Sequence, residues 1–216
     1  ILEAKVMKEL LKTNKISRAK KISTFLQRVD AFGKINDYEI EDLSFSASIV
    51  SYRPGEIICK EGDLISQTNF FIIVKRGSVE VFKHIENKVS MIKKKGDTGE
   101  EEKGERNKQL LFLKMCHPYD IVTCRKKIPQ QLLRGKCFKY KDMRNLRNHV
   151  TIRAKTMCEC VVIPQLALYK RLSCKSINYL ANCMPSYPLN IEANNQIKKK
   201  HVWENYKKQL VNDILL

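Results

Sequence analysis

The sequence contains no uncharged apolar run long enough to cross a membrane. Its longest such run, Cys160 to Leu168, is interrupted by Pro164 and Gln165 and is far shorter than the roughly 20 residues that a bilayer requires. Charges at positions 3, 5, 8 and 9 interrupt the amino-terminal segment, where a signal peptide would need an unbroken apolar region, so we do not expect this segment to be one. We therefore expect no membrane span. The chain starts at Ile1 without an initiating methionine, and we expect it to be part of a longer protein.

Acidic residues are scarce relative to basic ones. The 216 residues include 41 Lys or Arg and 23 Asp or Glu, which gives a formal net charge of +18. This excess predicts attraction to an anionic partner without identifying it as nucleic acid, lipid or acidic protein. The chain shows no internal repeat, and its 43% hydrophobic content excludes a collagen, a coiled-coil rod and a wholly disordered tail.

The eight cysteines have no paired spacing that predicts a disulfide framework or a zinc site. Cys158 and Cys160 are the closest pair, and a single intervening residue in a strand directs both side chains to one face. A zinc site instead needs two or more intervening residues and a second pair of ligands. We therefore interpret the cysteines as reduced, buried thiols of a cytoplasmic protein, with no bound metal.

Catalytic motifs are absent as well. The four histidines, at positions 84, 117, 149 and 201, do not accompany a serine or cysteine in a nucleophile-elbow context, and no phosphate loop of the G-x-x-x-x-G-K-[ST] type occurs. The sequence therefore predicts a protein that is not an enzyme.

The hydrophobic periodicity changes twice along the chain. Helical spacing covers residues 2–29, with a break expected at 14–17, and returns at 38–45, with Asp37 as the amino-terminal cap. Helical spacing resumes after Pro164. Between these regions lie short runs rich in β-formers, bounded by Pro, Gly or Asp, at 49–52, 56–59, 70–74, 78–82, 110–115, 119–123, 150–152 and 160–163.

The amino-terminal helical region is basic as well as amphipathic. Such a segment can bind a membrane surface or a calmodulin-like clamp. The alternative, which we favour, is that its apolar face, including Phe25 and Leu26, packs on the β-region.

Two motifs in the β-region carry a family resemblance. Residues 52–63, which read YRPGEIICKEGD, are followed by residues 70–81, which read FFIIVKRGSVEV. Pro54-Gly55 fits a type II turn, and Gly62 and Gly77 lie where successive strands reverse. These motifs strongly resemble the first half of a cyclic nucleotide-binding domain. With weaker matches at residues 117–124 and 151–156, the resemblance covers roughly residues 22–184.

The resemblance also implies where a cyclic nucleotide pocket would lie. In that family, helix amides and an arginine hold the cyclic phosphate, and a glutamate binds the ribose. Carried over, the family's glycine falls at Thr123, its glutamate at Cys124 and its arginine at Asn148, with His149 where a small residue is usual. All three diagnostic residues differ. Arg147 would be the phosphate ligand only if the alignment were shifted by one residue, which would reverse the strand face.

A basic insertion separates the two halves of this degenerate pocket. Residues 125–155 hold eleven Lys or Arg and a single acid, Asp142. Either the insertion is a solvated loop, or it docks an acidic protein or nucleic acid. The aromatic and basic tetrapeptide Phe138-Lys139-Tyr140-Lys141 is a weak signal of the nucleic-acid type. The candidate docking residues are Lys126, Lys127, Arg134, Lys136, Lys139 and Lys141.

The sequence as a whole predicts an α+β fold, in which an antiparallel, jelly-roll-like β-roll of about eight strands is flanked by amino- and carboxy-terminal helices. Residues 1–45 form the first helices. Residues 46–163 form the roll, with a mobile loop at 93–108 and the basic insertion at 125–147. Residues 164–216 form the last helices.

The expected function is that of a regulatory or sensor module, in which a ligand or partner in the roll repositions the carboxy-terminal helices. Its binding of cAMP or cGMP is expected to be lost or altered, and no cofactor is expected. The alternative is a pseudo-domain that binds a protein or nucleic acid through the insertion.

Overall fold

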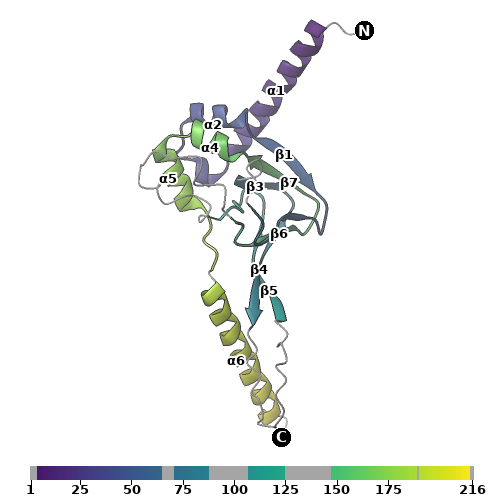
Figure 1. The fold of residues 1–216 in the computed structure, drawn as a ribbon, viewed down its shortest axis with the longest axis vertical. Helices are drawn as coiled ribbons and strands as arrows, with labels where there is room; N and C mark the ends of the chain where they lie inside the picture. Colours follow the sequence, from purple (N-terminus) through teal and green to yellow (C-terminus); the bar gives the residue numbers. More distant parts are fainter. Residues whose placement is uncertain (1–3, 65–70, 88–106, 125–146, 189, 215–216) are drawn as a thin grey trace, which may run out of the picture.

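The computed structural model describes residues 4–64, 71–87, 107–124, 147–188 and 190–214. Figure 1 shows helices around a central β-region, with the start of α1 and all of α6 extending from opposite ends of the molecule. The helices are α1 (Ala4–Leu26), the 3-10 helix η1 (Asp30–Phe32), α2 (Asp37–Ser44), α4 (Gln165–Arg171), α5 (Cys174–Cys183) and α6 (Asn190–Ile214). The strands are β1 (Ser48–Tyr52), β2 (Ile57–Cys59), β3 (Phe71–Arg76), β4 (Val79–Asn87), β5 (Asn107–Cys116), β6 (Thr151–Ala154) and β7 (Cys158–Ile163).

The seven strands form two antiparallel sheets, in the orders β1-β7-β3 and β2-β6-β4-β5. Strands β3 and β7 are nearly continuous apolar runs because both of their faces are buried. In β3, for example, Phe71 and Ile73 face one hydrophobic cluster while Ile72 and Val74 face another. This alternation follows from the two-residue period of a strand. The predicted α+β class with an antiparallel roll and helices at both ends is confirmed.

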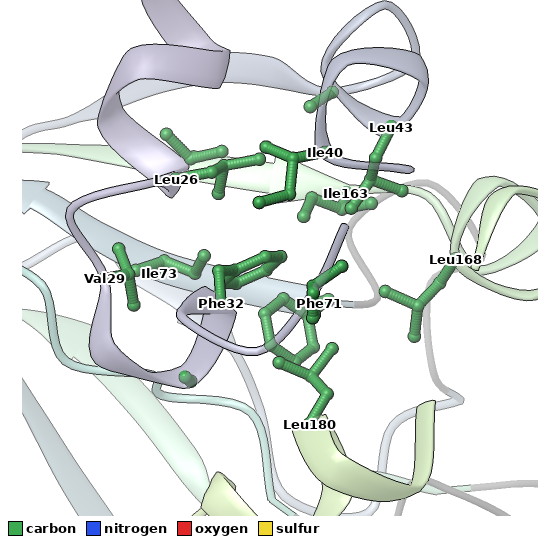
Figure 2. Close-up of a cluster of buried hydrophobic side chains, with 14 of the residues drawn as sticks. Leu26, Val29, Phe32, Ile40, Leu43, Phe71, Ile73, Ile163, Leu168 and Leu180 are labelled. Carbon is green, nitrogen blue, oxygen red and sulfur yellow. The ribbon is translucent and has the colours of Figure 1, made fainter. Parts of the chain in front are cut away.

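The first hydrophobic cluster lies between the helices and the outer face of the β1-β7-β3 sheet. Figure 2 shows Phe32 and Phe71 at its centre, between residues of the amino-terminal helices and Leu168 and Leu180 of the carboxy-terminal ones. Helix α1 contributes Leu26, which is fully buried. The favoured interpretation of the basic amino-terminal region, packing on the roll, is therefore right for the end of α1.

The second cluster fills the space between the two sheets and is rich in sulfur. Seven of the eight cysteines lie in the described residues, and none of these seven forms a disulfide. Cys158 and Cys160 both point into this cluster, as their spacing predicted, and Cys116 and Cys124 are buried there too. Cys174 and Cys183 are exposed, so the expectation of buried thiols is wrong for these two.

The predicted turn glycines lie where the chain requires a positive φ. Gly55, Gly62 and Gly77 have φ values of 84°, 86° and 78°, a region that glycine occupies without a steric penalty. The turn at Pro54-Gly55 is closed by a 3.0 Å hydrogen bond from the Glu56 amide to the Arg53 carbonyl. The glycine pattern therefore identified the corners of the roll correctly.

Several boundaries differ from the sequence-based expectations. The break expected at residues 14–17 does not occur, since α1 is continuous. Asn36, rather than Asp37, caps α2. The run at 119–123 forms only an isolated bridge, between Ile121 and Ile73, instead of a strand. Residues 107 and 108, assigned to the mobile loop 93–108, belong to β5, and the rest of that loop lies outside the described residues.

Helix α6 has exposed aromatic and aliphatic side chains, among them Trp203 and Tyr206, which stack with ring centroids 5.7 Å apart. No helix within the described ranges is both long and apolar enough to cross a membrane.

Candidate functional site

Thr123 and Cys124 lie inside the roll. Thr123 is fully buried, and its hydroxyl oxygen accepts a 2.7 Å hydrogen bond from the Ile72 amide of β3. Cys124 is buried in the sulfur-rich cluster. Both side chains therefore serve the packing and hydrogen bonding of the roll, and neither provides the carboxylate that the resemblance would place at position 124.

Asn148 is buried at the position that the resemblance assigns to the phosphate arginine. Its amide donates to the Asp63 carbonyl, and its carbonyl accepts from the Gly62 amide, both at 2.9 Å. Its side-chain oxygen is buried without a hydrogen-bond partner among the described residues. An asparagine amide carries no charge, so this position supplies no cation to the interior.

The neighbours of Asn148 point elsewhere. Arg147 is exposed, and its guanidinium donates a 2.6 Å hydrogen bond to the Gly62 carbonyl. His149 is exposed, while its backbone carbonyl accepts a 2.9 Å hydrogen bond from the Lys83 ammonium. The alternation along the chain thus places Asn148 inside and Arg147 and His149 outside.

The structure reveals an interior cation that the sequence interpretation missed. Lys83 in β4 is only 4% exposed. Its ammonium lies 3.0 Å from Glu61 Oε1, and its second bond is the one to the His149 carbonyl. The sequence signal was the two-residue period of β4, in which Val79, Val81 and Ile85 are buried on the same side as Lys83.

Glu61 makes several further hydrogen bonds. Its other carboxylate oxygen accepts a 2.7 Å bond from the His84 amide and lies 3.3 Å from His84 Nδ1. The Glu61 amide donates to the Thr151 hydroxyl at 3.0 Å. The Lys83 charge is therefore neutralised within the protein by the Glu61 carboxylate.

Tyr187 reaches into the roll from the segment after α5. It is 5% exposed, and its hydroxyl donates a 3.1 Å hydrogen bond to the Val122 carbonyl. Burial raises the pKa of the Tyr187 hydroxyl well above its ordinary value and raises the pKa of the neighbouring Cys116 thiol to about 11. Both groups are therefore neutral at physiological pH, which suits a packed interior.

No group of three or more His, Cys, Asp or Glu within the described part of the chain is arranged to hold a metal ion. The predicted docking residues fall in the interval 125–146, outside the described residues. They are Lys126, Lys127, Arg134, Lys136, Lys139 and Lys141.

Comparison with solved structures identifies the architecture. The regulatory subunit of a cAMP-independent protein kinase A from Trypanosoma cruzi, bound to guanosine, matches 86% of this chain and 52% of its own, with 20% identity and a TM-score of 0.51. The regulatory domain of Toxoplasma gondii protein kinase A with cAMP matches 77% of this chain and 48% of its own, with 13% identity and a TM-score of 0.50. The fold is that of a cyclic nucleotide-binding domain.

A third match is a mutant regulatory subunit of a cAMP-independent protein kinase A from Trypanosoma brucei, bound to cAMP in its A site. It matches 94% of this chain and 55% of its own, with 15% identity and a TM-score of 0.50. The chain thus spans about half the length of these proteins. No protein-family model and no curated protein matches the sequence.

Proposed function

We propose that this chain is a regulatory or sensor module that has the cyclic nucleotide-binding fold but binds cAMP and cGMP weakly or not at all. The observation that supports the proposal is that Asn148, which the resemblance assigns to the position of the phosphate arginine, is buried and uncharged. Lys83 does not replace that arginine, because Glu61 already neutralises it. No catalytic activity is expected.

The energetic consequence is large. Losing the partner of a buried charge costs roughly 2–5 kcal/mol, and each 1.4 kcal/mol is a factor of ten in affinity. Loss of the arginine contact alone would therefore move a micromolar ligand to the high-micromolar or millimolar range. Cys124 in place of the ribose-binding glutamate weakens binding further.

We expect calorimetric titration of the protein with cAMP and with cGMP to give no binding stronger than about the high-micromolar range. Guanosine, which has no phosphate, is the matched control ligand, since its binding does not depend on an arginine. A dissociation constant of a few micromolar or better for either cyclic nucleotide would contradict the proposal. If Arg147→Gln then abolished that binding, Arg147 would be the phosphate ligand.

The regulatory output would pass through Tyr187. This residue connects the roll, through its bond to the Val122 carbonyl, with the segment that leads into α6. A ligand that entered the roll beside residues 122–124 would have to displace the Tyr187 ring. The start of α6, three residues further along, would then move with it.

A second candidate function, docking of an acidic protein or nucleic acid, is supported by the charge of the insertion. Residues 125–147 hold nine Lys or Arg and one acid. We expect the quadruple variant Lys126→Ser, Lys127→Ser, Arg134→Ser and Lys136→Ser to elute from heparin at clearly lower salt than the parent, with a nearly unchanged melting temperature. Equal retention of the two proteins would show that the insertion has no docking function.

A further inference from the structure

A cavity of about 250 Å³ lies outside the roll, where the end of α1 meets the end of β3. Its residues come from three segments that are distant in sequence. They include two aromatic residues, Phe25 and Tyr119, and four cationic ones, Lys21, Arg28, Lys75 and Arg76. No acidic side chain lines this cavity, which we call the outer basic pocket.

The charge of the outer basic pocket is only partly compensated. Lys75 forms a 2.7 Å ion pair with Glu159, and Arg76 acts on the same carboxylate at longer range. Lys21 and Arg28 have no ion pair among the described residues. Cations gathered around one cavity repel one another, and an anion bound between them would relieve that repulsion.

Tyr119 provides an independent indication that the pocket has a ligand. It is the one non-glycine residue in the described part of the chain with a positive φ, 75°. Its turn is closed by a 3.0 Å hydrogen bond from the Asp120 amide to the His117 carbonyl. A side chain at such a φ is strained by roughly 1–3 kcal/mol, and glycine would avoid that cost.

The strained turn holds the Tyr119 ring at the pocket. The ring stacks on Phe25 with centroids 5.4 Å apart, yet Tyr119 remains 45% exposed. Arg28 and Tyr119 also line a larger cavity of about 660 Å³, whose other residues include the acids Asp30 and Asp120, so the phosphate belongs in the outer basic pocket and only the ring of a ligand would extend into the larger space. A ligand held by the cations therefore has room beside the exposed aromatic ring.

We propose that the outer basic pocket binds a phosphate monoester whose molecule also contains a flat aromatic ring. Arg28 and Arg76 donate charge-assisted hydrogen bonds to the phosphate, Lys21 adds a third positive charge, and Tyr119 offers its ring for stacking. The ligand is either a nucleoside monophosphate or a phosphorylated tyrosine, which share this chemistry. The pocket lies outside the roll, so the proposal is independent of cyclic nucleotide binding.

The test is calorimetric titration of the full chain with AMP, with O-phosphotyrosine, and with adenosine and tyrosine as the matched ligands that lack phosphate. We expect AMP or O-phosphotyrosine to bind below about 1 mM and its unphosphorylated counterpart to bind at least tenfold more weakly. The stronger of the two esters identifies the source. Failure of both esters to bind would overturn the proposal.

Two variants assign the binding to this pocket. Arg28→Gln with Arg76→Gln should weaken the ester at least tenfold, while the control pair Lys12→Gln with Lys15→Gln, which removes the same charge from an exposed part of α1, should leave affinity within about twofold. Equal losses of ester affinity in the two double variants would overturn the proposal, because they would show a non-specific effect of the protein's charge. Titration of the same Arg28→Gln, Arg76→Gln variant with cAMP and cGMP shows whether any binding of a cyclic nucleotide takes place in this pocket.

A third variant tests the ring. Tyr119→Gly removes the strain together with the side chain, so we expect its melting temperature to stay near that of the parent or to rise. Its affinity for the ester should fall several-fold, while any affinity for inorganic phosphate should not change. An unchanged ester affinity would overturn the stacking role of Tyr119.

Discussion

Gly77→Val is expected to unfold the roll. Gly77 has a φ of 78°, and a Cβ atom there would collide with the Met157 carbonyl oxygen and lie 2.8 Å from Cys158 Cβ. Cys158 belongs to β7, and Met157 lies in the turn just before it. Because β7 is paired with β1 on one side and with β3 on the other, its backbone cannot move away without a large cost in free energy. Strain at a positive φ costs roughly 1–3 kcal/mol and overpacking roughly 1–3 kcal/mol more. Their sum is a large part of a domain's total stability of roughly 5–15 kcal/mol.

The matched control is Gly55→Val. Gly55 has nearly the same φ, 84°, but a Cβ atom there would meet no atom within 4 Å. The two variants therefore share the backbone strain and differ in the steric collision. Thermal unfolding followed by circular dichroism should show Gly55→Val melting cooperatively below the parent, and Gly77→Val without a native transition. Equal melting temperatures for the two would mean that the close approach of Gly77 to β7 is not rigid.

The roll could be predicted because its signals are local. A glycine that needs a positive φ and a β-rich run leave their mark within a few residues, and this was enough to locate Gly55, Gly62, Gly77 and all seven strands. The run at 119–123 gave the same local signal, but its pairing with β3 is limited to one bridge, between Ile121 and Ile73. The expected break in α1 failed because residues 14–17 contain neither glycine nor proline, and polar side chains on an exposed helix do not end it.

The candidate site was harder to predict. The motif assigned Asn148 to the phosphate position, which stays a prediction, but the contacts that fill the interior join distant residues. Tyr187 reaches Val122 across 65 positions of the chain, and no pattern near either residue indicates that contact. Lys83 had a usable signal, the inward period of β4. A lysine in a strand is ordinarily assigned to the solvent face, and its partner Glu61 lies on a loop.

The second large effect concerns this interior pair. Lys83→Met should reduce the free energy of unfolding by up to roughly 3–5 kcal/mol, the range for breaking a buried pair, because it leaves the partly buried Glu61 carboxylate without its cation. Methionine has a similar length and fits the apolar side of β4, so the loss reflects charge and not volume. Glu61→Gln should also destabilise, since it leaves the Lys83 ammonium, which is 4% exposed, without its counter-ion.

The double variant Lys83→Met with Glu61→Gln removes both charges. It should recover most of the stability lost in either single variant, because replacing a buried pair by neutral groups is often close to neutral. Urea unfolding of the four proteins measures the coupling between the two residues. Losses that simply add in the double variant would show that Lys83 and Glu61 are not coupled, and would contradict the neutralisation of Lys83 by Glu61. The same four proteins test whether Glu61 keeps an anion such as a cyclic phosphate away from Lys83. Only Glu61→Gln leaves an uncompensated interior cation, so any gain in cAMP affinity should appear in that variant and disappear again when Lys83→Met is added.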